Sequence, residues 1–177
     1  MKTIFLLLFC TAFCFSCSKT VTELPPATQT GANTFGASVD GKLWVPEGFG
    51  IAPTAPILEA RFFPDSSFIM NARNFSLEPT ETEFEIFIRN MSTTGTYSLN
   101  TITANYPSQS ASYAYYVKRK FTPLNEWITN DQYTGTVTIT KNDNHIVSGT
   151  FQFQAINMYN NPQPITVTDG RFDVRVQ

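Results

Sequence analysis

Cysteine and histidine, two residue types common in active sites and metal sites, are scarce in this 177-residue chain. All three cysteines, Cys10, Cys14 and Cys17, lie near the N-terminus, and His145 is the only histidine. Beyond Cys17 no thiol remains for a disulfide, a cysteine nucleophile or a thiolate metal site, and one imidazole cannot supply a histidine-rich zinc site or a catalytic triad without partners. We therefore expect no metal, no cofactor and no enzymatic activity.

Clustered positive charge and long apolar runs are also scarce. The formal net charge is −2, and Lys118–Lys120 is the one basic run. Because phosphate contacts dominate affinity for nucleic acids, this composition argues against a nucleic-acid partner. After the N-terminus no apolar stretch approaches the roughly 18 residues of a membrane span, and none keeps a helical period of 3.6 residues. The composition leaves a mostly β domain as the expected fold class.

The first 16 residues are organised like a secretory signal. Lys2 supplies positive charge, and the apolar stretch Ile4–Phe15 is too short to span a bilayer. It ends in Cys14–Cys17, where a small residue directly before a cysteine resembles the lipobox of bacterial lipoproteins. That resemblance implies cleavage before Cys17 and lipidation of its sulfur, although Cys14 stands where the lipobox prefers an aliphatic residue. An ordinary secretion signal or an uncleaved anchor is the alternative.

A polar segment follows the proposed lipidation site. Residues 18–33 are rich in threonine and are interrupted by Pro25-Pro26, so their composition predicts a flexible spacer after Cys17. One domain is then expected over residues 34–177, which is long enough to bury a core of its own.

Alternation of apolar and polar residues with a period of two predicts most of the strands. Asp40-Gly41 between two apolar runs predicts a tight hairpin of residues 34–39 and 42–45, because both turn positions need positive φ. Further strands are expected at 57–63, 68–73, 81–90, 95–99 and 111–121. A single helical turn is expected at Thr122–Trp127, with Thr as its N-cap and Pro at its first position.

The C-terminal part, Thr134–Val176, predicts a three-stranded antiparallel meander. Phe151 and Phe153 alternate with polar residues, as do Phe172 and Val174, so each apolar set belongs on a core face. With roughly ten short strands and frequent turns, the sequence predicts a single antiparallel β-sandwich, with a closed β-barrel as the alternative.

Several segments in combination resemble a family of small lipoproteins from Bacteroidota that is known as a domain of unknown function. They are the lipobox, PATQTGANTFG, DGKLWVP, GTVTIT, IVSGTFQF and ITVTDGRFDV. The resemblance covers most of Cys17–Val176 and is weaker between Glu47 and Glu81; relatives carry cysteine where this chain has Ala37. It implies a Gram-negative envelope lipoprotein and brings no catalytic residues. Since Ser18 is not Asp and no acidic run follows, we expect an outer-membrane anchor on the periplasmic side.

Two acidic features could carry chemistry. Glu83 and Glu85 share one strand face and lie about 6–7 Å apart. This separation is compatible with the paired carboxylates of a glycosidase, so the spacing alone does not exclude glycan cleavage. Their alternation with apolar residues is also typical of a solvated strand face. Asn142–Asn144 before His145 offers oxygens to calcium but is better explained as a turn. Asp169-Gly170 is likewise expected to form a turn, and Asp173 is expected on an exposed face.

Aromatic residues supply the sharpest ligand hypothesis. Tyr113 and Tyr115 point to one face of a strand, and with Trp127 they could form a platform for stacking on glycans, although aromatics also serve as core fillers. Two functions therefore stay open. The first is a non-enzymatic lipoprotein, held in the membrane by a lipid on Cys17, that binds an envelope partner or has a structural role. The second is carbohydrate binding or cleavage.

Overall fold

A computed structural model describes residues 21–48, 56–76, 81–103, 108–119, 125–143, 145–159 and 163–177, and the secondary structure of these residues is entirely β, without a helix. The eleven strands are β1 (Thr34–Val39), β2 (Lys42–Trp44), β3 (Leu58–Phe62), β4 (Phe68–Asn74), β5 (Glu81–Ile88), β6 (Gly95–Leu99), β7 (Tyr113–Arg119), β8 (Glu126–Ile128), β9 (Gly135–Asp143), β10 (Ile146–Asn157) and β11 (Ile165–Arg175). Within these ranges no helix is long and apolar enough to cross a bilayer.

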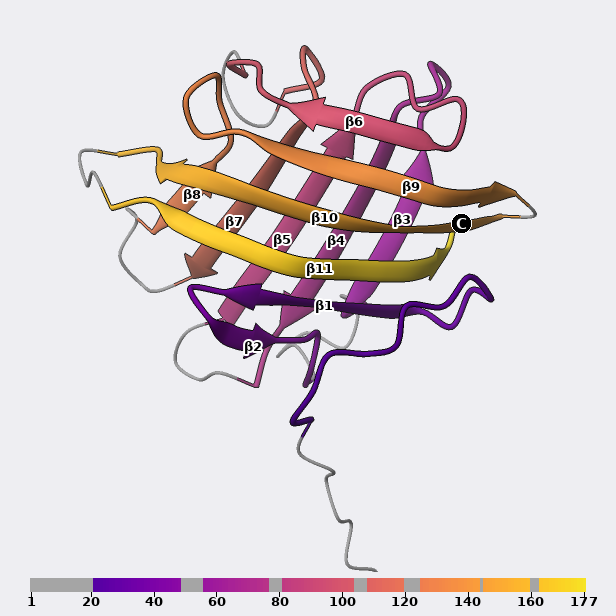
Figure 1. Cartoon of the computed structure of the whole chain (residues 1–177), viewed down its shortest axis with the longest axis horizontal. Helices are drawn as coiled ribbons and strands as arrows, with labels where there is room; N and C mark the ends of the chain where they lie inside the picture. Colours follow the sequence, from indigo (N-terminus) through magenta and orange to yellow (C-terminus); the bar gives the residue numbers. More distant parts are fainter. Residues whose placement is uncertain are drawn as a thin grey trace, which may run out of the picture.

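The strands form two layers of one curled sheet (Figure 1). One layer holds β6, β9, β10, β11, β1 and β2, and the other holds β8, β7, β5, β4 and β3. The long strand β10 joins them, because its first part pairs with β9 while Ile156 and Asn157 pair with β8. The sheet curls into a half-barrel that is open rather than closed. The predicted all-β antiparallel fold is confirmed, and the alternative of a closed barrel is not formed.

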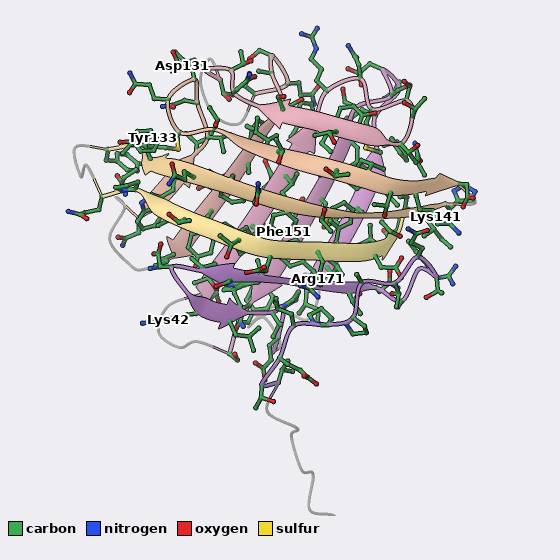
Figure 2. All side chains as sticks on the ribbon, in the orientation of Figure 1. Lys42, Asp131, Tyr133, Lys141, Phe151 and Arg171 are labelled. Atoms are coloured by element: carbon green, nitrogen blue, oxygen red, sulfur yellow. The ribbon has the colours of Figure 1, made fainter. Side chains whose placement is uncertain are left out.

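The main core lies between the two layers. The ring of Phe84 on β5 lies 5.4 Å from that of Phe35 on β1, 4.6 Å from that of Trp44 on β2 and 6.3 Å from that of Phe151 on β10. Figure 2 labels Phe151 among the side chains of its layer. Each such side chain contributes roughly 1.5–3 kcal/mol by leaving water. Contacts between aromatic rings from both layers therefore hold the half-barrel together.

The N-terminal hairpin has the predicted turn. Asp40 and Gly41 adopt φ values of 49° and 76°, and the Asp40 carboxylate accepts a hydrogen bond of 2.9 Å from the Thr166 N–H. On β2, the indole N–H of Trp44 donates to the Thr82 hydroxyl at 2.8 Å. These bonds fix the hairpin to both layers.

The predicted meander is confirmed as β9, β10 and β11, with one correction. Asp169-Gly170 is not a turn but a β-bulge inside β11, where the register shifts between the Phe151–Gly170 and Phe153–Val167 pairs. Asp169 has a φ of 55° there. A bulge and a hairpin turn both need positive φ, so the same dipeptide suits either.

The helical turn expected at Thr122–Trp127 is wrong in its second half. Glu126–Ile128 is strand β8, in which Trp127 pairs with Tyr116 of β7 and with Asn157 of β10. Pairing on both sides outweighs the local capping signal. Residues 122–124 lie outside the described residues.

Candidate functional site

Asp173 fastens the N-terminal segment to the sheet. Its carboxylate accepts hydrogen bonds from the backbone N–H groups of Thr30, Gly31 and Ala32, at 2.9, 2.8 and 3.1 Å. The residue is only 1% exposed, so the expectation of an exposed face is wrong. The spacer predicted for residues 18–33 is therefore shorter than its composition indicates, because long-range bonds to Asp173 hold its last part on β11.

Hydroxyl groups complete the shell of this carboxylate. Thr28 donates to one oxygen at 2.6 Å, and Ser148 of β10 donates to the other at 2.7 Å. Burial disfavours the charged form, but the hydrogen bonds from Thr28, Ser148, Ala32 and Thr30 outweigh it and hold the pKa of Asp173 well below its ordinary value. The charge of Asp173 is thus a structural element that links the N-terminal segment to β10.

The N-terminal segment continues across the outer side of β1. A Cβ built on Gly36 would lie 2.6 Å from the Pro25 ring and 3.1 Å from a methyl group of Leu24, so this segment packs directly on the strand. From there the chain reaches Val21, the first described residue. Residues 21–33 therefore belong to the surface of the β domain.

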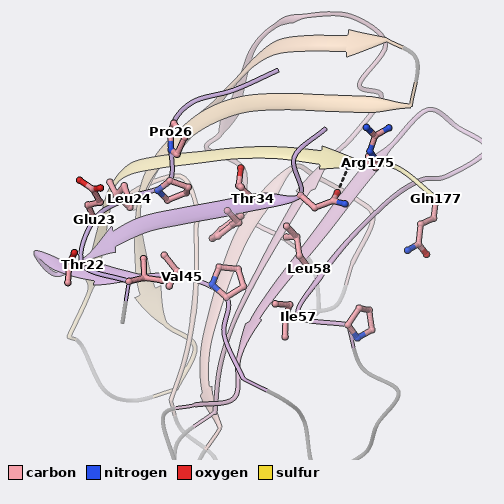
Figure 3. A pocket seen from close by; sticks show the side chains of 16 residues that line it. Thr22, Glu23, Leu24, Pro26, Thr34, Val45, Ile57, Leu58, Arg175 and Gln177 are labelled. Carbon is pink, nitrogen blue, oxygen red and sulfur yellow. Dashed lines mark hydrogen bonds between the residues drawn. The ribbon is translucent and has the colours of Figure 1, made fainter. Parts of the chain in front are cut away.

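An apolar groove of about 930 Å³ lies between this segment and the open side of the half-barrel (Figure 3). It runs from the N-terminal segment along β1 toward the start of β3 and the end of the chain. Its size falls within the roughly 300–1,000 Å³ of ligand pockets, and its walls are predominantly apolar. The apolar residues that line it are Val21, Leu24, Pro25, Pro26, Phe35, Val45, Pro46, Pro56, Ile57 and Leu58.

Hydrogen bonds to backbone carbonyls, two of them between the layers, set the shape of the groove. The Gln177 N–H donates to the Ala60 carbonyl at 3.1 Å, and the Asn74 side-chain amide donates to the Val45 carbonyl at 2.7 Å. At the rim, the Arg175 guanidinium donates to the Thr30 carbonyl at 3.3 Å. The open side is thus bridged at several points, and the groove is a formed feature of the fold.

Glu83 and Glu85 are held in a polar network rather than on a solvated face. Arg73 donates to Glu83 at 3.0 Å, Asn71 donates to Glu85 at 2.8 Å, and the Tyr113 hydroxyl donates to Glu85 at 2.6 Å. Glu83 is 9% exposed, so the solvated face predicted for this strand is wrong at that position. These partners give both carboxylates a structural role in joining β4, β5 and β7.

The three aromatic residues of the glycan-platform hypothesis do not come together. Tyr113, Tyr115 and Trp127 are 2%, 4% and 5% exposed. The two tyrosines belong to a second apolar cluster with Phe87, whereas Trp127 belongs to the main core and donates its indole N–H to the Gln163 carbonyl at 2.9 Å. Burial raises the pKa of Tyr113, and its bond to Glu85 raises it further. An exposed platform from these residues is therefore contradicted.

The remaining sequence candidates have plain explanations. His145 lies in the turn between β9 and β10 with a φ of 60°, which confirms its interpretation as a turn residue. Among the described residues, no group of three or more His, Cys, Asp or Glu side chains is placed to hold a metal ion. Cys17, the predicted lipidation site, lies outside the described residues.

The fold and the groove define an all-β half-barrel with a candidate ligand site on its open side. The family described as a domain of unknown function (DUF6252) matches residues 59–174, so the chain belongs to this family. No curated protein and no solved structure matches the chain.

The sequence alone does not predict the groove, because the segments that form its walls are far apart in the chain. Residues 21–26, 45–46, 56–58 and 175–177 meet there only through the curl of the sheet. The one local signal of the groove is the apolar and proline-rich character of Leu24–Pro26. The composition of residues 18–33 as a whole instead favours a flexible spacer.

Proposed function

We propose that this protein is a lipid-anchored lipoprotein of the cell envelope whose β domain is a non-enzymatic binding module. The observation that carries the anchor is the apolar stretch that ends in Ser16-Cys17. Two or more acyl chains, at about 0.8 kcal/mol per buried CH2, make such an anchor stable where a single chain binds only marginally. The absence of Asp at position 18 favours the outer membrane, on its periplasmic side.

The groove supports the binding role. The groove is a concave surface with a predominantly apolar lining, and its volume lies in the range of ligand pockets. In contrast, the carboxylates that first suggested glycan cleavage, Glu83 and Glu85, have hydrogen-bond partners that suit a structural role. An apolar ligand or an apolar partner segment therefore fits this surface better than a glycan.

Metabolic labelling with an alkyne-bearing fatty acid tests the anchor. We expect the wild-type chain to take up the label and Cys17→Ala to lose it, because the Cys17 sulfur would carry the diacylglyceryl group that holds the fatty acids. Cys10→Ala is the matched control, since it removes another cysteine of the signal and should keep the label. Equal labelling of Cys17→Ala and the wild type would overturn the proposal.

A further inference from the structure

The chain between the proposed lipid and the groove is very short. Val21 lines the groove, and only four residue steps separate it from Cys17. A fully extended chain spans at most about 3.6 Å per residue, so the anchor lies within roughly 14 Å of Val21. The bonds of Asp173 and the packing on Gly36 prevent residues 24–33 from adding to this length.

The mouth of the groove exposes apolar side chains. Val21 is 46% exposed and Ile57 is 39% exposed, and both line the apolar groove. Leu24 and Leu58 also line the groove and are partly covered. Exposed apolar side chains along a groove are candidates for contact with a partner, a ligand or a membrane.

The ionisable side chains that line the groove are one acid and one base. Glu23 and Arg175 are the two ionisable side chains among the described lining residues, and they carry opposite signs. A strongly charged partner, whether acidic or basic, would therefore find no surface of opposite charge in the groove. An uncharged apolar ligand suits the groove better. With a lipid on Cys17, the nearest source of such a ligand is the apolar interior of the bilayer.

We infer that the open side of the half-barrel lies on the bilayer and that the groove takes up an acyl chain of a bilayer lipid. The inference rests on the proposed lipidation of Cys17, which brings the groove to the membrane surface. The acyl chain would cover Val21, Ile57 and Leu58. The domain would then hold a fixed orientation on the membrane instead of moving on a long tether.

Position-specific quenching tests this orientation. All native cysteines lie at or before position 17, so Ile57→Cys creates a unique free thiol in the mature lipidated chain. The variant is labelled with a small environment-sensitive fluorophore and placed in phosphatidylethanolamine–phosphatidylglycerol vesicles that contain lipids with a quencher on the acyl chain. We expect several-fold stronger quenching at position 57 than at Met158→Cys, whose native side chain is similarly exposed, at 38%, outside the groove.

A second measurement separates the groove from the fluorophore's own affinity for lipid. The label is moved to Pro56→Cys, and Ile57→Glu is added to place a charge at the mouth. Quenching should then fall several-fold, while Met158→Glu should leave it unchanged.

The outcomes distinguish the inference from the proposed function. Anchored protein with equally weak or equally strong quenching at positions 57 and 158 would overturn the orientation and leave the lipoprotein proposal standing. Unchanged quenching in Ile57→Glu would also overturn the role of the groove. A mature chain without lipid on Cys17 would overturn the proposed function and, with it, the reason for placing the groove at a membrane.

Discussion

Asp173 shows how one buried carboxylate organises a distant segment. Its oxygens accept bonds from backbone and hydroxyl groups of residues 28–32 and from Ser148. Hydrogen bonds to a charged group are worth about 1.5–3 kcal/mol each, and removing their shared partner leaves several donors unsatisfied at once. Asp173 is therefore a main attachment of the N-terminal segment to the domain, beside the packing of Pro25 on Gly36 and the bond from Arg175 to Thr30.

Removing the carboxylate should destabilise the protein. We expect Asp173→Ala to lower the free energy of unfolding by about 2–4 kcal/mol, because donors such as the Gly31 N–H and the Ser148 hydroxyl lose their acceptor. Denaturant titration measures the change. Asp143→Ala is the control, since that side chain is 60% exposed in a surface ion pair with Lys141 and should cost at most about 1 kcal/mol. Equal effects of the two substitutions would contradict this role of Asp173.

The same carboxylate should contribute to acid sensitivity. The pKa of Asp173 is lowered in the folded protein, so below the unfolded value of about 3.9 the unfolded chain binds a proton that the folded chain does not. Stability therefore falls as the pH drops from about 4 toward the lower folded pKa. Asp173→Asn should show a shallower decline in unfolding free energy over that window. Parallel curves for the two proteins would show that Asp173 does not contribute.

Strand β11 is the element on which the layer around Asp173 is built. It pairs with β1 on one side and β10 on the other, and both ladders shift register near its bulge. At that point a Cβ on Gly170 would lie 2.5 Å from the ring of Phe151, so only glycine lets the ring lie against the strand. The bulge thus couples backbone shape to the packing of the core.

Gly170→Ala tests this coupling. The added methyl group must displace the buried ring of Phe151, and such overpacking costs about 1–3 kcal/mol of unfolding free energy. Thermal or denaturant unfolding measures it. Thr166→Ala on the same strand changes an exposed side chain and should stay within about 0.5 kcal/mol. A Gly170→Ala protein as stable as the wild type would show that the ring moves freely.

Local patterns predicted the elements better than their connections. Period-two alternation found the meander, and Asp40-Gly41 found the first hairpin, because both signals act over a few residues. The same local signal at Asp169-Gly170 predicts a turn, which is wrong. Whether such a dipeptide forms a turn or a bulge depends on the strands that pair with it. The bonds of Asp173 to residues 28–32 and the burial of Tyr113 depend on chain pairing over long distances, and neither leaves a local trace in the sequence.

Three features of the described chain lie on the same side of the molecule. The open side of the half-barrel carries the N-terminal segment, the C-terminal residues 175–177 and the apolar groove (Figure 3). With an anchor on Cys17, this side would lie within about 14 Å of the lipid, because only four residue steps intervene. The proposed anchor, the segment bound to Asp173 and the groove therefore lie together, and the premise of this arrangement is the lipid on Cys17.

Intact mass measurement of the mature protein, purified from the membranes of a Gram-negative expression host, tests that premise most directly. We expect a chain that begins at Cys17 and carries the added mass of at least two acyl chains, located on the N-terminal peptide. An unmodified chain, or one that begins at any other residue, would contradict it.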